Sequence, residues 1–205
     1  MTPAPREDLD RILHDLRGPL NSMVMHVEVL KRVLASDADA LASIATIQQE
    51  LARLGRMLPA AFDVLALERG EVARVNLRSL VDRAVVEHRL AVVQVQDGAW
   101  PDVEGDADLL VLAIAHLVRN ALAATQSAGR TDHPPLVAVD TAEPGRATLV
   151  VRDWGAGFKN SNPKAQIRLS GVGLLTVERV ARLHGGQLSF GSPGGGAEVR
   201  LTLPA

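Results

Sequence analysis

A glycine-rich stretch in the last third of the chain carries the residue types that bind a polyphosphate. It opens with Asp153, continues through Gly155 and Gly157, and closes with Gly171 and Gly173 at the head of an apolar-periodic segment. Glycine lets the backbone approach a phosphate closely, and a helix N-terminus offers unpaired N–H groups and a favourable dipole. Asp153 follows a β-branched run, so its carboxylate is expected at a strand end, where it can accept a hydrogen bond from an exocyclic amine such as that of adenine. The stretch therefore predicts a nucleotide-binding loop.

His14 is the second candidate for chemistry. It lies in the segment His-Asp-Leu-Arg-Gly-Pro-Leu-Asn, one residue past an apolar seam, and so points about 100° away from the seam, toward solvent. An exposed neutral imidazole is a competent nucleophile near neutral pH, especially when a carboxylate holds its other ring nitrogen. Asp15 is the neighbour in sequence, but adjacent helical residues diverge, and Asp10 shares a helix face with His14. Both carboxylates are candidates for that contact.

The element that must position His14 is a pair of helices. Two apolar seams with steps of three and four residues predict an antiparallel hairpin that ends near Gly70. The seams consist of Leu9, Leu13, Leu16, Leu20, Met23, Val27, Leu30 and Leu34, then Ile44, Ile47, Leu51, Leu54, Leu58, Ala61 and Leu65. Two helices bury such seams poorly alone, so a homodimer with a four-helix bundle is expected. Pro19 and Pro59 lie within the two helices and should bend them.

The rest of the chain mixes helices and strands. Strands are predicted at 75–77, 91–95, 136–140, 147–151, 187–190 and 198–203, and helices at 78–90, from 107 onward and at 173–184. Asp106 is the expected N-cap of the middle helix. The fold class is therefore α+β. A helical hairpin over residues 1–70, expected to dimerise, precedes an α/β sandwich with a largely antiparallel sheet over residues 71–205.

Composition narrows the function classes. The formal net charge of −2 at pH 7 and an aromatic content of 2% argue against a nucleic-acid binder. The absence of cysteine excludes thiolate metal sites and cysteine nucleophiles. No apolar run approaching a membrane span is evident, and the polar N-terminus does not resemble a signal peptide. We expect a cytoplasmic protein without direct membrane insertion.

Taken in order along the chain, these motifs resemble the core of a two-component sensor histidine kinase. The segment from His14 is similar to the family's phosphoacceptor box, which implies that His14 is phosphorylated and that Asp15 is its acid/base partner. Ala-His-Leu-Val-Arg-Asn-Ala-Leu around Asn120 is similar to the N box, which implies a Mg²⁺ ligand at Asn120. An asparagine oxygen suits Mg²⁺, which keeps several waters and phosphate partners. The resemblance covers nearly the whole sequence, and it implies a dimerisation and histidine phosphoacceptor hairpin over residues 1–70 and an ATP-binding catalytic domain over residues 71–205.

The glycine pairs complete the resemblance to the histidine kinase ATPase type of domain. It implies that Asp153 reads adenine beside Gly155 and Gly157, and that Gly171 and Gly173 contact the phosphates of ATP. The loop 158–170 between the pairs is the expected lid, and its basic residues are candidates to meet phosphates. These are Lys159, Lys164 and Arg168.

Some positions depart from the family's pattern. His116 stands where another asparagine is usual, and Ala123 where a basic residue is common, while the lid is short and has no phenylalanine-centred box. These departures bear on catalytic rate more than on nucleotide binding. Gly18, four residues after His14, replaces the Thr or Asn that orients a water in related kinases with phosphatase activity, so phosphatase activity is expected to be weak or absent.

Three functions remain open from the sequence. The first is an ATP-dependent protein-histidine kinase that autophosphorylates His14 and passes the phosphoryl group to an aspartate of a response regulator, under the control of an upstream sensory partner. The second is a histidine phosphotransfer protein that relays phosphate between receiver domains and has a degenerate kinase domain. The third is a dimeric scaffold that binds nucleotide. Loss of function on substitution of His14 separates the first two from the third.

Overall fold

The structure, a computed structural model, describes residues 6–90, 92–158 and 172–205, with the backbone alone over 6–11. The chain divides into two compact units, Met1–Ala66 and Leu67–Ala205. The predicted α+β class is confirmed. The dimerisation and phosphoacceptor role of residues 1–70 and the ATP-binding catalytic role of residues 71–205 stay predictions.

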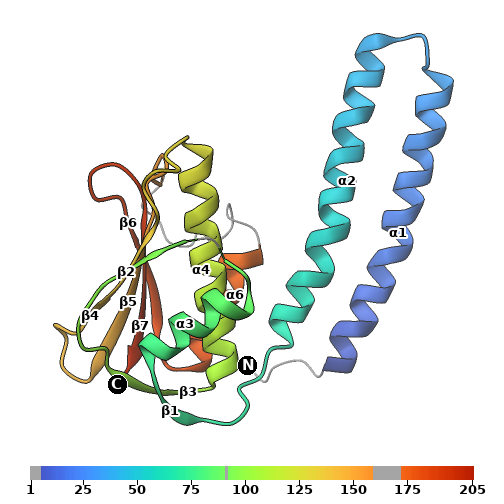
Figure 1. The fold of residues 1–205 in the computed structure, drawn as a ribbon. Helices are drawn as coiled ribbons and strands as arrows, with labels where there is room; N and C mark the ends of the chain where they lie inside the picture. Colours follow the sequence, from blue (N-terminus) through green and yellow to red (C-terminus); the bar gives the residue numbers. More distant parts are fainter. Residues whose placement is uncertain (1–5, 91, 159–171) are drawn as a thin grey trace. The chain divides into compact units, whose positions relative to one another are not determined.

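The first unit is a hairpin of two long helices, α1 (Arg6–Val33) and α2 (Ala38–Leu65), which run side by side in opposite directions (Figure 1). Asp37 caps α2, because its Oδ1 accepts hydrogen bonds from the N–H groups of Asp39 and Ala40 at 3.1 and 3.0 Å. Both helices continue through Pro19 and Pro59.

Only part of each apolar seam is used between the two helices of the hairpin. Val27, Ile44 and Leu51 are buried there, and Leu20 packs against them. Other seam residues keep a large exposed area in the single chain, with relative exposures of 36–50%. They are Leu16, Met23, Leu30, Leu34, Ile47, Leu54 and Leu65.

The second helix ends before the predicted end of the hairpin. α2 ends at Leu65 and is capped by Ala66, whose N–H bonds to the carbonyl of Phe62, whereas the sequence placed the end near Gly70. Tertiary contacts of the residues after Leu65 explain this difference. Leu67 packs against the core of the second unit, and the N–H of Gly70 donates to the carboxylate of Asp106 at 2.8 Å. These contacts take the last four residues out of the helix.

The second unit has two sheets. The larger has the order β2-β4-β5-β7-β6, in which β2 pairs parallel with β4 and the other neighbours pair antiparallel, while β1 and β3 form a separate antiparallel pair. The strands are β1 (Ala73–Asn76), β2 (Gln94–Val95), β3 (Asp102–Gly105), β4 (Leu136–Asp140), β5 (Arg146–Arg152), β6 (Gln187–Gly191) and β7 (Glu198–Pro204). The predicted strand at 91–95 is thus reduced to two residues, and β3 was not expected.

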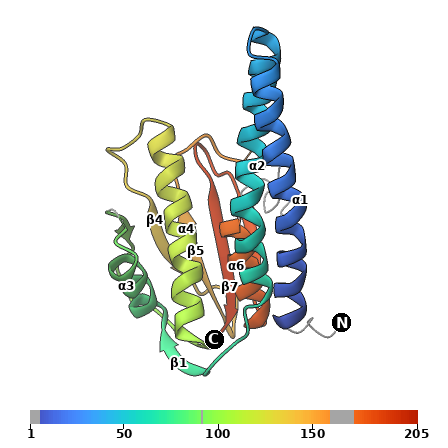
Figure 2. The same ribbon diagram turned by 90° about the vertical axis from the view of Figure 1, so that its right-hand side faces the viewer.

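Three helices cover one face of the larger sheet: α3 (Leu77–Glu87), α4 (Ala107–Ser127) and α6 (Val172–Leu183) (Figure 2). The core between the two layers is aliphatic, and its fully buried side chains include Leu110, Ile114, Leu117, Leu149 and Leu201. Burial of this apolar area is the main force that holds the two layers together.

Helix α4 is the central helix of this core. The predicted cap is confirmed, since Oδ1 of Asp106 accepts from the N–H groups of Asp108 and Leu109, each at 3.1 Å. Helix α4 is also long and apolar enough to cross a membrane by length and composition, with a mean hydropathy of 1.6. Its apolar side chains are however buried under the sheet and the neighbouring helices, so its composition is explained by its position in the core.

Candidate active site

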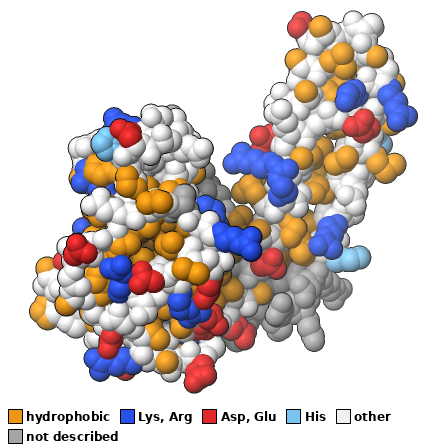
Figure 3. All heavy atoms as spheres, viewed as in Figure 1, with side chains coloured by type: hydrophobic (Ala, Val, Ile, Leu, Met, Phe, Trp, Pro, Cys, Tyr) orange, Lys and Arg blue, Asp and Glu red, His pale blue; other side chains and the backbone are white. Residues whose placement is uncertain are grey.

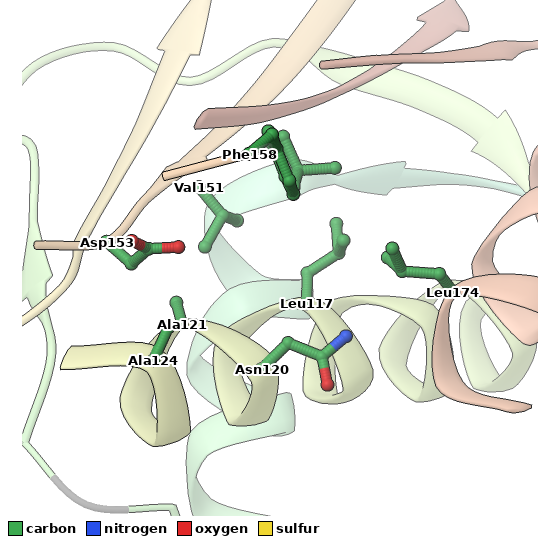
Figure 4. Close-up of a pocket in the computed structure, with 9 residues that line it drawn as sticks. Leu117, Asn120, Ala121, Ala124, Val151, Asp153, Phe158 and Leu174 are labelled. Carbon is green, nitrogen blue, oxygen red and sulfur yellow. The ribbon is translucent and has the colours of Figure 1, made fainter. Parts of the chain in front are cut away.

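A cavity of about 230 Å³ opens between α4, the start of α6 and the sheet (Figure 4). Its lining is largely aliphatic, with two polar side chains, those of Asp153 and Asn120. A second hollow of about 270 Å³ shares Ala124, Asp153 and Phe158 with it. An apolar cavity with a few placed polar groups is the usual form of a small-molecule site.

Asp153 is the fixed polar group of the cavity. It follows β5 directly and is 8% exposed. Its Oδ1 accepts hydrogen bonds from the N–H groups of Gly155 at 2.8 Å and Ala197 at 2.9 Å, and its own N–H donates to the carbonyl of Ala197. Among the described residues, no hydrogen bond reaches Oδ2. Figure 4 shows the carboxylate of Asp153 directed toward the cavity. It can accept a hydrogen bond from an amine of a ligand without first changing its orientation.

The first glycine pair is required by close packing. A Cβ on Gly155 would lie 3.0 Å from both the Cβ and the carbonyl oxygen of Ala124 on α4. Gly157 has a φ of +74°, and a Cβ there would lie 2.9 Å from the carbonyl oxygen of Gly196. Glycine is the residue that accepts both the positive φ and the contact. The loop after β5 is therefore held tightly between α4 and the segment before β7.

Asn120 lines the cavity from α4 and lies beside Gly173 of α6. Asn120 is exposed on α4, and a Cβ on Gly173 would lie 3.7 Å from each of its amide atoms and 3.3 Å from Nδ1 of His116. The first turn of α6 thus faces the side chains of Asn120 and His116, which lie one helical turn apart. Gly171 and the basic residues Lys159, Lys164 and Arg168 lie outside the described residues.

His116 is held as a neutral imidazole. Burial lowers its pKa first, and the charges of Arg119 and His88 lower the pKa further. Nη1 of Arg119 lies 3.5 Å from Nδ1 of His116. The substitution of the usual asparagine by His116 therefore leaves an uncharged polar side chain beside Asn120 at ordinary pH.

The described residues fit a magnesium ion carried by a nucleotide better than a resident metal. No group of three His, Cys, Asp or Glu side chains able to hold a metal occurs in the described part of the chain. Asn120 nevertheless offers an exposed hard-oxygen ligand beside the glycine of α6. Mg²⁺ needs few protein ligands when phosphates and waters complete its octahedron.

His14 and Asp15 belong to the first unit. Both side chains are largely exposed, 85% and 69%, and Nδ1 of His14 lies 3.6 Å from Oδ1 of Asp15. The expectation that adjacent helical side chains diverge was therefore too strict, because rotation of the two side chains brings them within ion-pair distance. The side chain of Asp10 lies outside those that the structure describes. His26 is exposed on the same helix.

Sequence reasoning missed the residues that hold the loop after β5 from a distance. Oγ1 of Thr125 on α4 accepts from the N–H of Trp154 at 3.2 Å. Phe158 packs edge-on against Phe190, with ring centroids 5.4 Å apart, and lines the cavity. The run of glycines that ends at Gly196 indicates a close approach of two backbone segments. The sequence does not show that the other segment is at Asp153, 43 positions earlier.

Comparison with known proteins agrees with this geometry. Residues 105–205 match the family described as histidine kinase-, DNA gyrase B- and HSP90-like ATPase. The sensor-like histidine kinase SenX3 of Mycobacterium tuberculosis is 28% identical over 100% of this chain and 55% of its own length. The chain thus spans about half the length of that relative.

Solved structures show the same fold. The ATP-binding domain of PrrB from Mycobacterium tuberculosis is 25% identical, covers 66% of this chain and 98% of that domain, and superimposes with a TM-score of 0.54. Full-length ShkA in complex with AMPPNP covers 100% of this chain and 46% of its own, with 20% identity and a TM-score of 0.58, and supports the fold alone. Together the family match over residues 105–205 and the histidine kinase relatives support a two-component sensor histidine kinase core, in which helical segments are followed by an ATPase domain.

Proposed function

We propose that the protein is an ATP-dependent protein-histidine kinase that autophosphorylates His14 and transfers the phosphoryl group to an aspartate of a response regulator. The observation that supports this most is that a fixed carboxylate, Asp153, and an exposed amide, Asn120, line one apolar cavity. An adenine at the first and phosphates at the second suit the polarity of these two side chains. The matched relatives carry the name of the same activity.

In the proposed reaction Asp153 accepts a hydrogen bond from the adenine amine, and Gly155 and Gly157 keep the loop close. Gly171 and Gly173 are proposed to contact the phosphates, and Asn120 to ligate Mg²⁺. The metal supplies neutralisation of charge on the phosphates when it is bound.

His14 is the proposed nucleophile. In the proposed step the carboxylate of Asp15, whose Oδ1 lies 3.6 Å from Nδ1 of His14, accepts a hydrogen bond from Nδ1–H, and the lone pair of Nε2 attacks. A bond then forms between Nε2 and the γ-phosphorus as the bond from that phosphorus to the bridging oxygen of ADP breaks, and Asp15 stabilises the charge on the ring. The second transfer moves the phosphoryl group to a carboxylate of the partner, with loss of its bond to Nε2.

A homodimer is proposed on the evidence of the hairpin surface. Apolar seam residues stay exposed along both helices of the single chain, and Figure 3 shows hydrophobic side chains on the surface of the hairpin. A second hairpin that covers them completes a four-helix bundle and removes this area from water.

The remaining expectations stand as parts of the same proposal: an upstream sensory partner, a cytoplasmic location for this core, and weak phosphatase activity because of Gly18. Nothing in the described residues or the matched relatives favours the phosphotransfer or scaffold alternatives.

The test is incubation of the purified protein with Mg²⁺ and γ-labelled ATP, with His14→Ala, Asn120→Ala and, as a matched control, His26→Ala. We expect an acid-labile, base-stable label in the wild type and in His26→Ala, and none in the other two variants. Omission of Mg²⁺ should abolish labelling as well. A label that persists in His14→Ala would refute the assigned phosphoacceptor, and binding of nucleotide without any label would refute the kinase.

A further inference from the structure

The first residues of the second unit, 67–70, are fixed at both ends, and we call them the strap. Their predecessor Ala66 is the C-cap of α2. At one end Leu67 is half-buried against the core, and its carbonyl accepts from Nη2 of Arg179 at 2.9 Å. At the other end the N–H of Gly70 donates to Oδ2 of Asp106 at 2.8 Å. Leu67 follows Ala66 directly, so no residue lies between the cap of α2 and the first anchor of the strap.

The two anchors belong to the helices that form the candidate site. Asp106 caps α4, which carries Asn120. Arg179 lies on α6, whose first turn contains Gly173. Between the anchors, Glu68 and Arg69 are exposed. The strap is thus attached to the two helices that border the candidate site.

The contacts are suited to release. Nε of Arg179 is buried and has no hydrogen-bond partner among the described residues, so the guanidinium is incompletely satisfied while the strap is bound. Gly70 is exposed, so its N–H bonds to water when it leaves Asp106. Asp106 keeps the cap hydrogen bonds from Asp108 and Leu109 in either state, because these use its other oxygen. Release of the strap therefore need not unfold α4.

We propose that the strap is a releasable section of the tether between the hairpin and the ATPase unit, and that Arg179 is the positioning residue that holds it. This role rests on the proposed function, since phosphorylation of His14 requires the ATPase unit to reach the hairpin. Four freed residues add at most about 14 Å of reach. In the bound state the strap restricts that reach, and in the released state it permits transfer.

The experiment compares Arg179→Gln with Arg179→Lys, which keeps a donor, and with Arg182→Gln, an exposed arginine of the same helix that pairs with Glu178. Two measurements do not depend on kinase activity. The first is the rate of tryptic cleavage after Arg69 together with hydrogen exchange at the Gly70 amide. Loss of one charge-assisted hydrogen bond should raise both rates roughly tenfold in Arg179→Gln, with little change in the other two variants.

The second measurement uses the absence of cysteine from the chain. Spin labels on Ala52→Cys in α2 and Gln187→Cys in β6, diluted with unlabelled protein, report the distance between the units. In Arg179→Gln we expect the distance distribution to extend by up to about 14 Å, with ATP affinity and melting temperature unchanged. A purely structural role for Arg179 would lower the melting temperature and leave the distribution as it was.

The labelling rate of His14 completes the test and should rise in Arg179→Gln. Unchanged cleavage and distances in Arg179→Gln, or equal changes in Arg182→Gln, would overturn the role of the strap. A released strap with an unchanged or lower labelling rate, in a wild type that does label His14, would overturn it too. If no variant labels His14, the kinase function fails, while cleavage and distance still decide whether Arg179 holds the strap.

Discussion

Asp153 combines a structural and a proposed binding role in one carboxylate, and the two can be separated. In Asp153→Asn, Oδ1 still accepts from Gly155 and Ala197, so the loop should keep its conformation. The negative charge offered to a ligand amine is lost, and an amide NH₂ can take its place. We expect ATP affinity to fall about tenfold or more, the scale of one hydrogen bond to a charged group. Calorimetric titration with ATP and a melting curve of the same variant measure both effects.

The contrary result would be a large fall in melting temperature with unchanged affinity per folded molecule. That outcome would assign Asp153 to loop stability alone. Thr125→Val is a useful companion, because it removes the acceptor for the Trp154 N–H without touching the carboxylate. It should cost stability and leave the preference for adenine nucleotides in place.

The cost of a side chain at Gly157 has two parts, the positive φ and the contact with Gly196. Gly129 has a similar φ, +69° against +74°, but nothing lies within 4 Å of its Cβ position. Gly129→Ala should therefore lower the free energy of unfolding by about 1 kcal/mol, the cost of the φ alone. Gly157→Ala should cost about 2 kcal/mol or more, since the carbonyl of Gly196 must also move. Denaturant unfolding of the two variants gives the difference, and equal costs would mean that the loop relaxes freely.

At this scale the sequence was informative where chemistry restricts the residue type. Asp153, Asn120 and the glycine pairs could be named as candidates because few other residue types suit the proposed tasks. Ala197 and Thr125 could not, because almost every residue type has a backbone N–H and residues with a hydroxyl occur at many positions of the chain. Their relevance comes from pairing across 44 and 29 positions, which the order of residues does not reveal.

Helix α4 depends on a cap that also holds the strap. Burial by itself raises the pKa of Asp106, but hydrogen bonds from the N–H groups of Leu109, Gly70 and Asp108 outweigh it and lower the pKa below the ordinary carboxyl value. In Asp106→Asn one cap acceptor remains, while the bond from Gly70 loses its anionic acceptor. The variant should be less stable by about 1–2 kcal/mol at neutral pH.

The pH dependence follows from the direction of that shift. A carboxyl whose pKa is lower in the folded state stabilises the fold above its unfolded pKa, about 3.8, and this stabilisation is lost as the pH falls through the lower folded value. The stability gap between the wild type and Asp106→Asn should therefore be constant above pH 5 or so and close in acid. Urea unfolding across that range measures it, with Asp108→Asn, in the same helical turn, as the control. A gap that persists in acid would rule out the charge of Asp106 as its source.

Helices and strands that carry a regular local sequence pattern were predicted correctly, and those without one were not. The seams of α1 and α2 and the cap of α4 are local patterns, and each predicted its helix. The end of α2 was predicted too late because Leu67 is apolar and resembles one more residue of the helix. In the structure Leu67 packs against the core of the second unit instead. β3 was missed because its four residues are stabilised by pairing with β1, from Ala73 with Gly105 to Asn76 with Asp102, and not by a pattern of their own.

At the scale of the whole molecule, the two units differ in how complete they are as single chains. The ATPase unit buries its aliphatic core between helices and sheet without help from another chain. The hairpin buries three apolar residues in its own cluster and leaves others of the same seams exposed. Contiguous exposed apolar surface marks an interaction site. We therefore expect the hairpin to be the part of the molecule that binds a second chain.

The oligomeric state can be tested by placing a charge on the seam and beside it. Leu30 is a seam residue with 47% exposure, and Val29, with 55%, lies about 100° away on the outer side of the helix. Leu30→Asp should convert a dimer to a monomer, because an unpaired carboxylate buried in an apolar interface costs several kcal/mol. Val29→Asp should remain dimeric, since its carboxylate stays in water. Sedimentation velocity over a range of concentrations distinguishes the two. Equal behaviour of both variants would mean that the seam is not the interface, and a monomeric wild type would remove the four-helix bundle.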